Sequence, residues 1–343
     1  MAFEKITEIV KTAPPFTQLI DLAAERLGGK VLFATDDFFA EKENLIKPGR
    51  GVFIHDKYTD RGKWMDGWES RRKRDPGHDW CVVQLATPGK ITGFDIDTNF
   101  FLGNHPPHAS IDGLLLSNSE TITNWDSNSI NWKVILSKSP LDPGSQNFYA
   151  CSSNEIVTHV RLHIYPDGGV ARLRVYGEVY KDWSEVSDNE EVDLAAAING
   201  GKAIQCNDMF FSSMNNLIMP ERGINMGDGW ETKRNRTPGN KDWVLLKLAK
   251  SGYINRIIVD THHFKGNYPD ACLIEGCLSE NDEDMIEGTT DWQILLPVQK
   301  LSADTEHEYQ KELTNKTKYS HVRLTIFPDG GVSRLRLFGT VKN

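Results

Sequence analysis

The sequence predicts an all-β protein made of two tandem β-sandwich domains of the jelly-roll type, and three observations carry this prediction. First, DGWESRRKRDPGHDW begins at Asp66 and DGWETKRNRTPGNKDW begins at Asp228, a displacement of 228 − 66 = 162 residues. Second, PDGGVARLRVYG at Pro166 and PDGGVSRLRLFG at Pro328 keep the same displacement of 162 residues. Third, short runs of alternating apolar and polar residues lie between clusters of Gly, Pro, Asn and Asp, which is typical of antiparallel sandwiches.

A period this long indicates a duplicated domain, because solenoid and propeller units repeat every 20–50 residues or so. The copies open with DLAAERLGGK at Asp21 and DLAAAINGGK at Asp193. We therefore expect four segments: an N-terminal helical extension (1–20), a first jelly-roll repeat (21–180), an acidic linker (181–192) and a second repeat (193–343).

Two features precede the first DGWE block. A short amphipathic helix is predicted at the N-terminus, with apolar residues from Leu19 to Leu27 and Gly28-Gly29 as its end. The first copy then has an additional loop from Val52 to Met65, where the second copy has only Ile224 to Gly227.

The strands are predicted from residues that alternate with a period of two. Val160, Leu162 and Ile164 alternate with polar or aromatic residues before the PDGG turn, and Leu173 and Val175 alternate with arginines after it. This pattern predicts a β-hairpin with Asp-Gly in its turn. Further strands are expected at WCVVQLA, ITGFDID and WKVILS and at their counterparts WVLLKLA, INRIIVD and WQILLPV.

Composition excludes several classes of protein. The chain is 39% hydrophobic and 25% charged, and no stretch approaches the roughly 20 apolar residues that span a bilayer. A net charge of −9 argues against a protein that binds nucleic acid by neutralising phosphates. The five cysteines are odd in number and none is duplicated between the copies, so we expect reduced thiols and a cytoplasmic protein.

The DGWE blocks concentrate ionisable residues in segments that Gly and Pro mark as loops, where sandwich proteins usually carry binding groups. The candidates are Asp66, Glu69, Arg72, Arg74, His78 and Asp79 in the first block and Asp228, Glu231, Arg234, Arg236 and Asp242 in the second. The alternative is that the block is retained for its shape. In that case Asp66 accepts backbone N–H bonds, and Trp68 and Trp80 are core residues.

Arginines also alternate after each PDGG turn. Arg172 and Arg174 share one strand face, and Arg161 on the predicted partner strand is expected to face them. A buried row of this kind would be an anion site, whereas an exposed row would be a solvated face. The second copy repeats the pattern with Arg334 and Arg336, and Asp167 and Asp329 are interpreted as turn residues.

Histidines cluster at His105, His108, His262 and His263. Structural and catalytic zinc sites usually need three or four ligands at recognisable spacings, and the chain has neither CxxC nor HExxH. We therefore expect no metal and no other cofactor. No GxSxG motif indicates a covalent nucleophile.

Three blocks, each present twice, resemble the allantoicase family. They are DGWE-x-x-R-x-R-x-x-G, the pair DTNFFLGNHP at Asp97 and DTHHFKGNYP at Asp260, and PDGGV-x-RLR. The resemblance covers nearly the whole chain. It implies a repeated jelly roll similar to galactose-binding-like domains, hydrolysis of allantoate to ureidoglycolate and urea in purine catabolism, and a homo-oligomer. One departure is that the family's His-Phe form survives at His263-Phe264, while the first copy has Phe100-Phe101.

Such a substrate defines what the site must supply. An arginine can hold the carboxylate of allantoate in a two-pronged hydrogen bond, and side-chain oxygens can accept its ureido N–H groups. The substrate-binding candidates are Arg72, Arg74, Asn104, His105, Arg172, Arg174, Arg234, Arg236, Asn267, Arg334 and Arg336. The candidates for proton transfer are Glu69, His78, Glu231 and His263.

A second hypothesis is a tandem sugar-binding module without chemistry, because the same fold serves both purposes. A sugar-binding loop would depend on exposed aromatic and amide side chains, whereas Glu, Asp, Arg and His dominate these loops. The sequence therefore favours the enzyme. It leaves open which repeat carries out the reaction and which residue is the acid.

Overall fold

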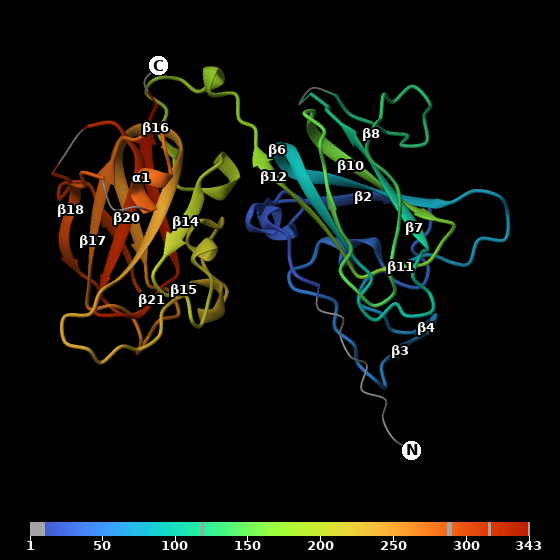
Figure 1. Cartoon of the computed structure of the whole chain (residues 1–343), viewed down its shortest axis with the longest axis horizontal. Coiled ribbons are helices and arrows are strands. Elements are labelled where there is room, and N and C mark those ends of the chain that lie inside the picture. The colour runs from blue at the N-terminus through green and yellow to red at the C-terminus, as the bar shows by residue number, and fades with distance from the viewer. Residues whose placement is uncertain (1–10, 118–119, 287–289, 315–316, 342–343) are drawn as a thin grey trace. The chain divides into compact units, whose positions relative to one another are not determined.

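The computed structural model describes residues 11–117, 120–286, 290–314 and 317–341. The chain divides into two compact units, Met1–Tyr180 and Lys181–Asn343 (Figure 1). Among the described residues every helix is five residues long or shorter, so the prediction of an all-β fold is confirmed. None of these helices is long and apolar enough to cross a membrane.

The first unit is a two-layered sandwich. One layer has the order β2, β6, β10, β7, β8, and the other has the order β9, β6, β12, β1. The strands are β1 (Ile20–Asp21), β2 (Lys30–Ala34), β6 (Asp79–Asp97), β7 (His108–Leu114), β8 (Lys133–Pro140), β9 (Phe148–Ala150), β10 (Ile156–Tyr165) and β12 (Arg172–Val179).

Strand β6 belongs to both layers. Two separate strands were predicted at WCVVQLA and ITGFDID, but they form one continuous strand of 19 residues. β10 pairs with its first half from Asp79 to Gln84, whereas β12 pairs with its second half from Gly89 to Asp97. Alternation with a period of two is the same in one long strand as in two short ones, so the sequence pattern does not separate these cases.

The predicted hairpin around the PDGG turn is wrong. β10 pairs with β6 and β7, and β12 pairs with β6 and β1, so the strands on either side of the turn are in different layers. The turn instead supplies β11 (Gly169–Val170), which pairs with β5 (Trp68–Glu69). This short ladder brings the first DGWE block to one end of the sandwich.

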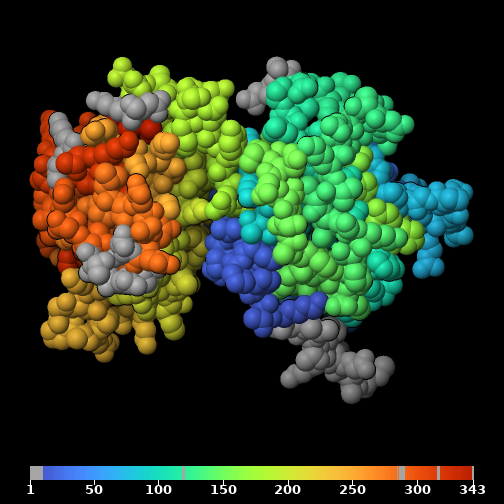
Figure 2. Space-filling model, turned by 45° about the horizontal axis from the view of Figure 1, so that its top comes forward, coloured from blue at the N-terminus to red at the C-terminus, as the bar shows by residue number. Residues whose placement is uncertain are grey.

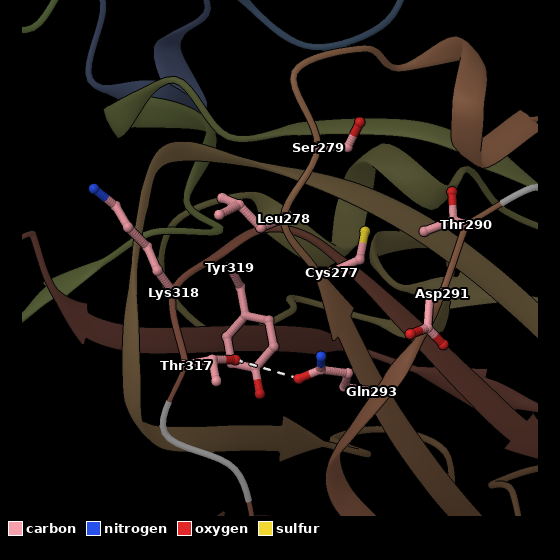
Figure 3. Close-up of a pocket in the computed structure, with 9 residues that line it drawn as sticks. All are labelled: Cys277, Leu278, Ser279, Thr290, Asp291, Gln293, Thr317, Lys318 and Tyr319. Carbon is pink, nitrogen blue, oxygen red and sulfur yellow. Dashed lines mark hydrogen bonds between the residues drawn. The ribbon is translucent and has the colours of Figure 1, made fainter.

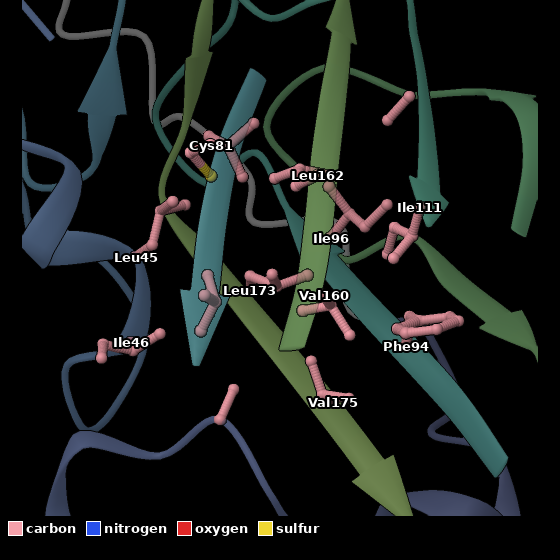
Figure 4. Packing of buried hydrophobic residues seen from close by; sticks show 14 of the residues in the cluster. Leu45, Ile46, Cys81, Phe94, Ile96, Ile111, Val160, Leu162, Leu173 and Val175 are labelled. Atoms are coloured by element: carbon pink, nitrogen blue, oxygen red, sulfur yellow. The ribbon is translucent and has the colours of Figure 1, made fainter. Parts of the chain in front are cut away.

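The core of the first unit lies between its layers (Figure 4). Cys81 and Phe94, from the two halves of β6, meet Leu162 of β10 and Leu173 of β12, and all four side chains are fully buried. Burying a side chain of this size contributes about 1.5–3 kcal/mol, so this packing joins the two layers.

The second unit repeats this arrangement. One layer has the order β14, β16, β20, β17, β18, and the other has β19, β16, β22, β13. The strands are β13 (Val192–Asp193), β14 (Lys202–Cys206), β16 (Asp242–Asp260), β17 (Ala271–Cys277), β18 (Gln293–Lys300), β19 (Glu306–Tyr309), β20 (Tyr319–Phe327) and β22 (Arg334–Thr340). The ladder between β15 (Trp230–Glu231) and β21 (Gly331–Val332) corresponds to the one between β5 and β11.

The described part of the predicted N-terminal helix is not α-helical; residues 1–10 lie outside the description. Two short 3-10 helices, η1 (Pro15–Gln18) and η2 (Glu25–Leu27), flank β1. The Asp21 carboxylate accepts the backbone N–H of Val175 at 2.9 Å, and Leu22 is buried where Gly89 leaves it room. These contacts with β12 and β6 outweigh a weak local preference for helix.

The remaining elements are connections. The additional loop carries a small hairpin of β3 (Tyr58–Thr59) and β4 (Gly62–Lys63). The short helices are η3 (Lys42–Ile46), η4 (Trp183–Glu185), η5 (Ala197–Asn199), η6 (Met214–Ile218), η7 (Met226–Asp228) and α1 (Glu283–Ile286). None of the five cysteines, all of them in the described part of the chain, is in a disulfide.

Candidate functional site

Each repeat holds a glutamate against an asparagine beside its PDGG turn. The Asn104 amide donates to the Glu69 carboxylate at 2.7 Å, and Asn267 donates in the same way to Glu231. The backbone carbonyl of Asn104 accepts the backbone N–H of Gly169 at 2.8 Å. The PDGG turn therefore holds the asparagine in place as well as the short strand that carries the glutamate.

The backbone around Glu69 is held on three sides. It pairs with Gly169 in β11 and forms a bridge with Ala40, and the neighbouring Trp68 indole donates to the carbonyl of Asp36 at 2.8 Å. The Trp68 side chain is fully buried, as expected for a core residue. The carboxylate is thus carried by a rigid support rather than by a free loop.

A cavity of about 740 Å³ surrounds Glu231 in the second repeat. Arg234, Arg236 and Asn267 line it, so the structure brings four of the predicted residues together. Phe211, Tyr268, Asp270 and Asp329 also line it; none of these was predicted as a site residue, and Asp329 was interpreted as a turn residue.

The first repeat has a cavity of about 460 Å³ around Glu69 and Asn104. Its cations are Arg61 and Lys63, which the additional loop supplies, and neither was predicted. Burial raises the pKa of Glu69, and the hydrogen bond from Asn104 only partly opposes this effect. Each repeat therefore combines a carboxyl group, an amide and cations within one cavity.

A repeated pair of phenylalanines was a signal that the sequence interpretation missed. Phe38–Phe39 and Phe210–Phe211 stack edge to face at corresponding positions and are exposed. Phe39 and Phe211 line the two cavities. Adjacent exposed aromatic residues in polar loops of both copies indicate a ligand surface.

Arg72 and Arg74 are exposed and lie in the segment 71–77, which stands out from the first repeat (Figure 2). The Asp167 carboxylate accepts the backbone N–H of Lys73 at 2.7 Å, and Asp329 accepts that of Asn235 at 2.8 Å. Both turn aspartates thus hold the DGWE segment in place. Within the described chain neither Arg72 nor Arg74 makes a hydrogen bond or ion pair.

The arginines after the PDGG turns do not line either cavity. Arg172 is 3% exposed and donates to the Asp66 carboxylate at 2.8 Å, and Arg334 is 2% exposed and donates to Asp228 at 2.9 Å. Both also donate to backbone carbonyls. A buried guanidinium with these partners is an internal ion pair that ties the DGWE block to the sheet.

The predicted cationic row is also absent from the described first repeat. Arg174 donates to the carbonyl of Lys47 at 2.6 Å, and Arg336 donates to that of Glu221 at 2.7 Å. Arg161 is on β10, in the other layer, and donates to Asp112 at 2.7 Å. The row was inferred from the predicted hairpin, and because the hairpin is wrong, Arg161 does not face Arg172 and Arg174.

The predicted histidines do not converge on one site, although the rings of His262 and His263 lie 3.9 Å apart between their centroids. The backbone of His263 is in the left-handed region, with φ of 71°. Its ring contacts the backbone carbonyl of Gly223 at 2.9 Å and does not line the Glu231 cavity. His105 corresponds to Tyr268, and its Nδ1 is buried without a partner among the described residues. His78 contacts His163 at 2.8 Å. No group of three or more His, Cys, Asp or Glu in the described chain is arranged to hold a metal ion.

A third cavity of about 480 Å³ is at the opposite end of the second repeat, beside Tyr319 and the end of β17 (Figure 3). Its charged lining residues are Asp291 and Lys318. It also supplies a carboxyl group, an amide and a cation, from Asp291, Gln293 and Lys318, but it contains no arginine and none of the site residues predicted from the duplicated blocks.

The fold and these two cavities define a duplicated β-sandwich protein with a polar small-ligand site in each repeat. The model of the allantoicase repeat matches residues 20–180 and 192–342. A protein described as a probable allantoicase from Pseudomonas fluorescens (strain SBW25) is 49% identical over 331 residues, which cover 96% of this chain and 98% of that protein. A second one, from Photobacterium profundum, is 49% identical and covers 94% and 97%.

Among solved structures, that of allantoicase from Saccharomyces cerevisiae is 38% identical with a TM-score of 0.78, and the match covers 93% of this chain and 92% of that one. The chain belongs to the allantoicase family. The resemblance seen in the three duplicated blocks is therefore confirmed.

Proposed function

We propose that the protein hydrolyses allantoate to ureidoglycolate and urea, as an enzyme of purine catabolism. The observation that supports this most directly is the family match over both repeats, together with a carboxyl group, an amide and cations in one cavity of each repeat. The substrate is a small anion, so no nucleic acid or membrane is needed as a partner.

The cavities suit the substrate by its chemistry. Allantoate carries one carboxylate and two ureido groups on its central carbon. Arg234 and Arg236 in one cavity, and Arg61 and Lys63 in the other, supply cations for the carboxylate. The carboxylate of Glu231 accepts ureido N–H groups, and the asparagine beside each glutamate carries both a donor and an acceptor.

The reaction needs two proton transfers. Water gives up a proton as its oxygen bonds to the central carbon, and the departing ureido nitrogen takes a proton and leaves as urea. Glu69 fits the second role, because burial raises its pKa and so favours the protonated form that can donate. Arg172, Arg174, Arg334 and Arg336 act by holding the site together rather than by binding the substrate.

The assay that tests this function measures urea and ureidoglycolate released by the purified protein from allantoate. Stoichiometric release of both products is expected at neutral to mildly alkaline pH. Binding of a simple sugar without any urea from allantoate would instead support the non-catalytic sugar module.

We also propose that the protein is a cytoplasmic homo-oligomer. The additional loop of the first repeat presents Val52, Ile54 and Tyr58 at 54%, 46% and 68% exposure, an unusual concentration of apolar surface. Light scattering of the purified protein should give a multiple of the 38.7 kDa chain mass. A mass of one chain at assay concentration would contradict this.

A further inference from the structure

A chain of three hydrogen-bonded side chains lies on the face of the first repeat formed by β6, β10 and β7. Nε2 of His78 lies 2.8 Å from Nδ1 of His163, and Nε2 of His163 lies 2.9 Å from Oδ2 of Asp112. His163 and Asp112 are 8% and 7% exposed, whereas His78 is half-buried at the end of the DGWE block. The chain therefore leads from a buried carboxylate to an accessible imidazole.

These contacts determine where the ring protons lie when both histidines are neutral. An ionised carboxylate can only accept, so Nε2 of His163 carries the proton that it donates to Asp112. Nδ1 of His163 is then an acceptor, and Nε2 of His78 must carry a proton and donate to it. Nδ1 of His78 is left with a free lone pair, which makes it an oriented base.

The surroundings keep His78 ready to accept a proton. Burial lowers the pKa of His78, and the charges of His163 and Lys73 lower it further, against the opposing effect of Asp79. Burial alone would raise the pKa of Asp112, but the hydrogen bonds from His163 and Arg161 outweigh it and hold the pKa below its ordinary value. Asp112 is thus an anion that accepts the Nε2 proton of His163 and fixes the tautomer of that ring.

Aromatic contacts fix the ring of His78 from the side. The centroid of the Tyr165 ring lies 4.4 Å from that of the His78 ring, and the Tyr165 hydroxyl is hydrogen-bonded to the Ser110 hydroxyl at 2.9 Å. Lys138 is placed over the Tyr165 ring at 4.3 Å from its centroid. His78 has therefore few alternative orientations.

The second repeat keeps the frame of this cluster but not its titratable rings. Arg323 donates to Glu275 at 2.7 Å and lies over Trp292, as Arg161 donates to Asp112 and lies over Trp132. However, Asn240 stands at the place of His78 and Thr325 at that of His163. Asn240 donates to the carbonyl of Pro328, which is a structural contact.

We propose that Asp112 and His163 are positioning residues that orient His78 as the base of the first repeat, and that the second repeat has no equivalent base. This step rests on the proposed function. The proton of the attacking water passes to Nδ1 of His78, the water oxygen bonds to the central carbon, and the carbon–nitrogen bond breaks as Glu69 protonates the departing urea. His78 lies outside the lining of the Glu69 cavity, and the two residues are connected through the PDGG turn, since the His78 ring packs at a tilt against Tyr165 and Glu69 pairs with Gly169; the bound substrate then extends from that cavity to His78.

The test is the pH profile of kcat/KM for variants that copy the second repeat. His78→Asn should lower kcat about 10²-fold, the contribution typical of general base catalysis, with Tm near that of the unmodified protein. His163→Thr should lower kcat less and should shift the acidic limb of the profile, because the ring that accepts the Nε2 proton of His78 is lost. Asp112→Glu, which copies Glu275, should retain more activity than Asp112→Asn.

The matched control is Thr325→Ala in the second repeat, which should leave the profile unchanged. A merely structural role of His163 would lower activity at every pH without moving the acidic limb. Nitrogen NMR of the unmodified protein, which needs no variant to fold, should find the proton of neutral His78 on Nε2; a proton on Nδ1 overturns the proposal. Full turnover by His78→Asn overturns this step alone, whereas no urea from the unmodified protein overturns the proposed function as well.

Discussion

Glu69 and Glu231 are held by the same local fold in different surroundings. Each pairs through its backbone with the PDGG turn and accepts from an asparagine amide. Glu69 faces a cavity bordered by Phe53, Phe100, Arg61 and Lys63, where burial raises its pKa, whereas Glu231 faces one bordered by Arg234 and Arg236. A carboxyl group whose pKa is raised by burial is the better proton donor.

Replacement of each glutamate by glutamine separates these two roles. Glu69→Gln should lower kcat about 10²-fold or more, because a general acid is lost, while Tm stays near that of the unmodified protein. Glu231→Gln should lower kcat far less and is the matched control. Urea release and thermal unfolding measure both effects. Equal, small losses from the two variants would exclude Glu69 as the proton donor.

Asp95 is a second residue that distinguishes the repeats. It is 2% exposed, its Oδ1 has no hydrogen-bond partner among the described residues, and Ile258 stands at its place in the second repeat. Burial, assisted by the charge of Asp97, raises the pKa of Asp95 to about 7 from 3.8. The folded state therefore keeps a proton that the unfolded state loses, and stability falls as pH rises from about 4 to about 7.

Asp95→Asn removes the titrating group and keeps a side-chain oxygen that can accept the hydrogen bond from the Gln146 amide. Its Tm should be close to that of the unmodified protein below about pH 4, where Asp95 is protonated in both the folded and the unfolded state, and higher at about pH 8, where the buried carboxylate is ionised. Thermal unfolding across this pH range measures the difference. A difference in Tm that stays constant with pH would show that Asp95 does not titrate in this range.

At the scale of elements, the PDGG turn connects the two layers and holds the candidate site. Gly169 and Gly331 lie against the fully buried rings of Phe101 and Phe264, where an added Cβ would approach ring carbons to 2.0 and 1.9 Å. Only glycine allows this approach, so the turn, the ring and the glutamate strand form one packed unit.

Gly169→Ala and Gly331→Ala should each reduce the free energy of unfolding by about 1–3 kcal/mol, the usual cost of overpacking a core. Gly103→Ala is the control for stability, because nothing lies within 4 Å of its added Cβ. Denaturant unfolding compares the three variants. If Gly169→Ala were as stable as Gly103→Ala, the contact with Phe101 would not be tightly packed.

At the scale of the whole molecule, each repeat is a compact unit with its own sandwich core. Trp68 and Trp230 occupy corresponding places in the two units and are both fully buried. Their indoles donate to the carbonyls of Asp36 and Asp208, each at 2.8 Å. Local stability should therefore be determined repeat by repeat.

Trp68→Ala should cost the first repeat about 3–5 kcal/mol, and Trp230→Ala should cost the second repeat a similar amount. Hydrogen exchange measured by mass spectrometry should show faster exchange in the altered repeat alone. Each variant serves as the control of the other. Equal acceleration in both repeats would indicate that the two units unfold together.

The sequence by itself determined the duplication, the all-β class and the family, and it indicated Glu69, Glu231, Asn104 and Asn267 as candidate site residues. These features follow from repeated blocks and local alternation, which neighbouring residues specify. Tertiary structure alone decided which strands pair. Alternation of apolar and polar residues shows that successive side chains point to opposite faces of a strand, but it does not show which strand is the partner. The segments on either side of the PDGG turn were therefore wrongly predicted to pair as a hairpin.

Tertiary structure also decided what each charged residue does. Arg172 is buried because Asp66, 106 residues away, meets it, while Arg234 lines a cavity and pairs with no carboxylate of the described chain. His78 becomes an oriented base only because the sheet brings His163, 85 residues away, to its ring. The free energy of a charged group depends on its partners and its burial, and both are set by contacts between distant parts of the chain.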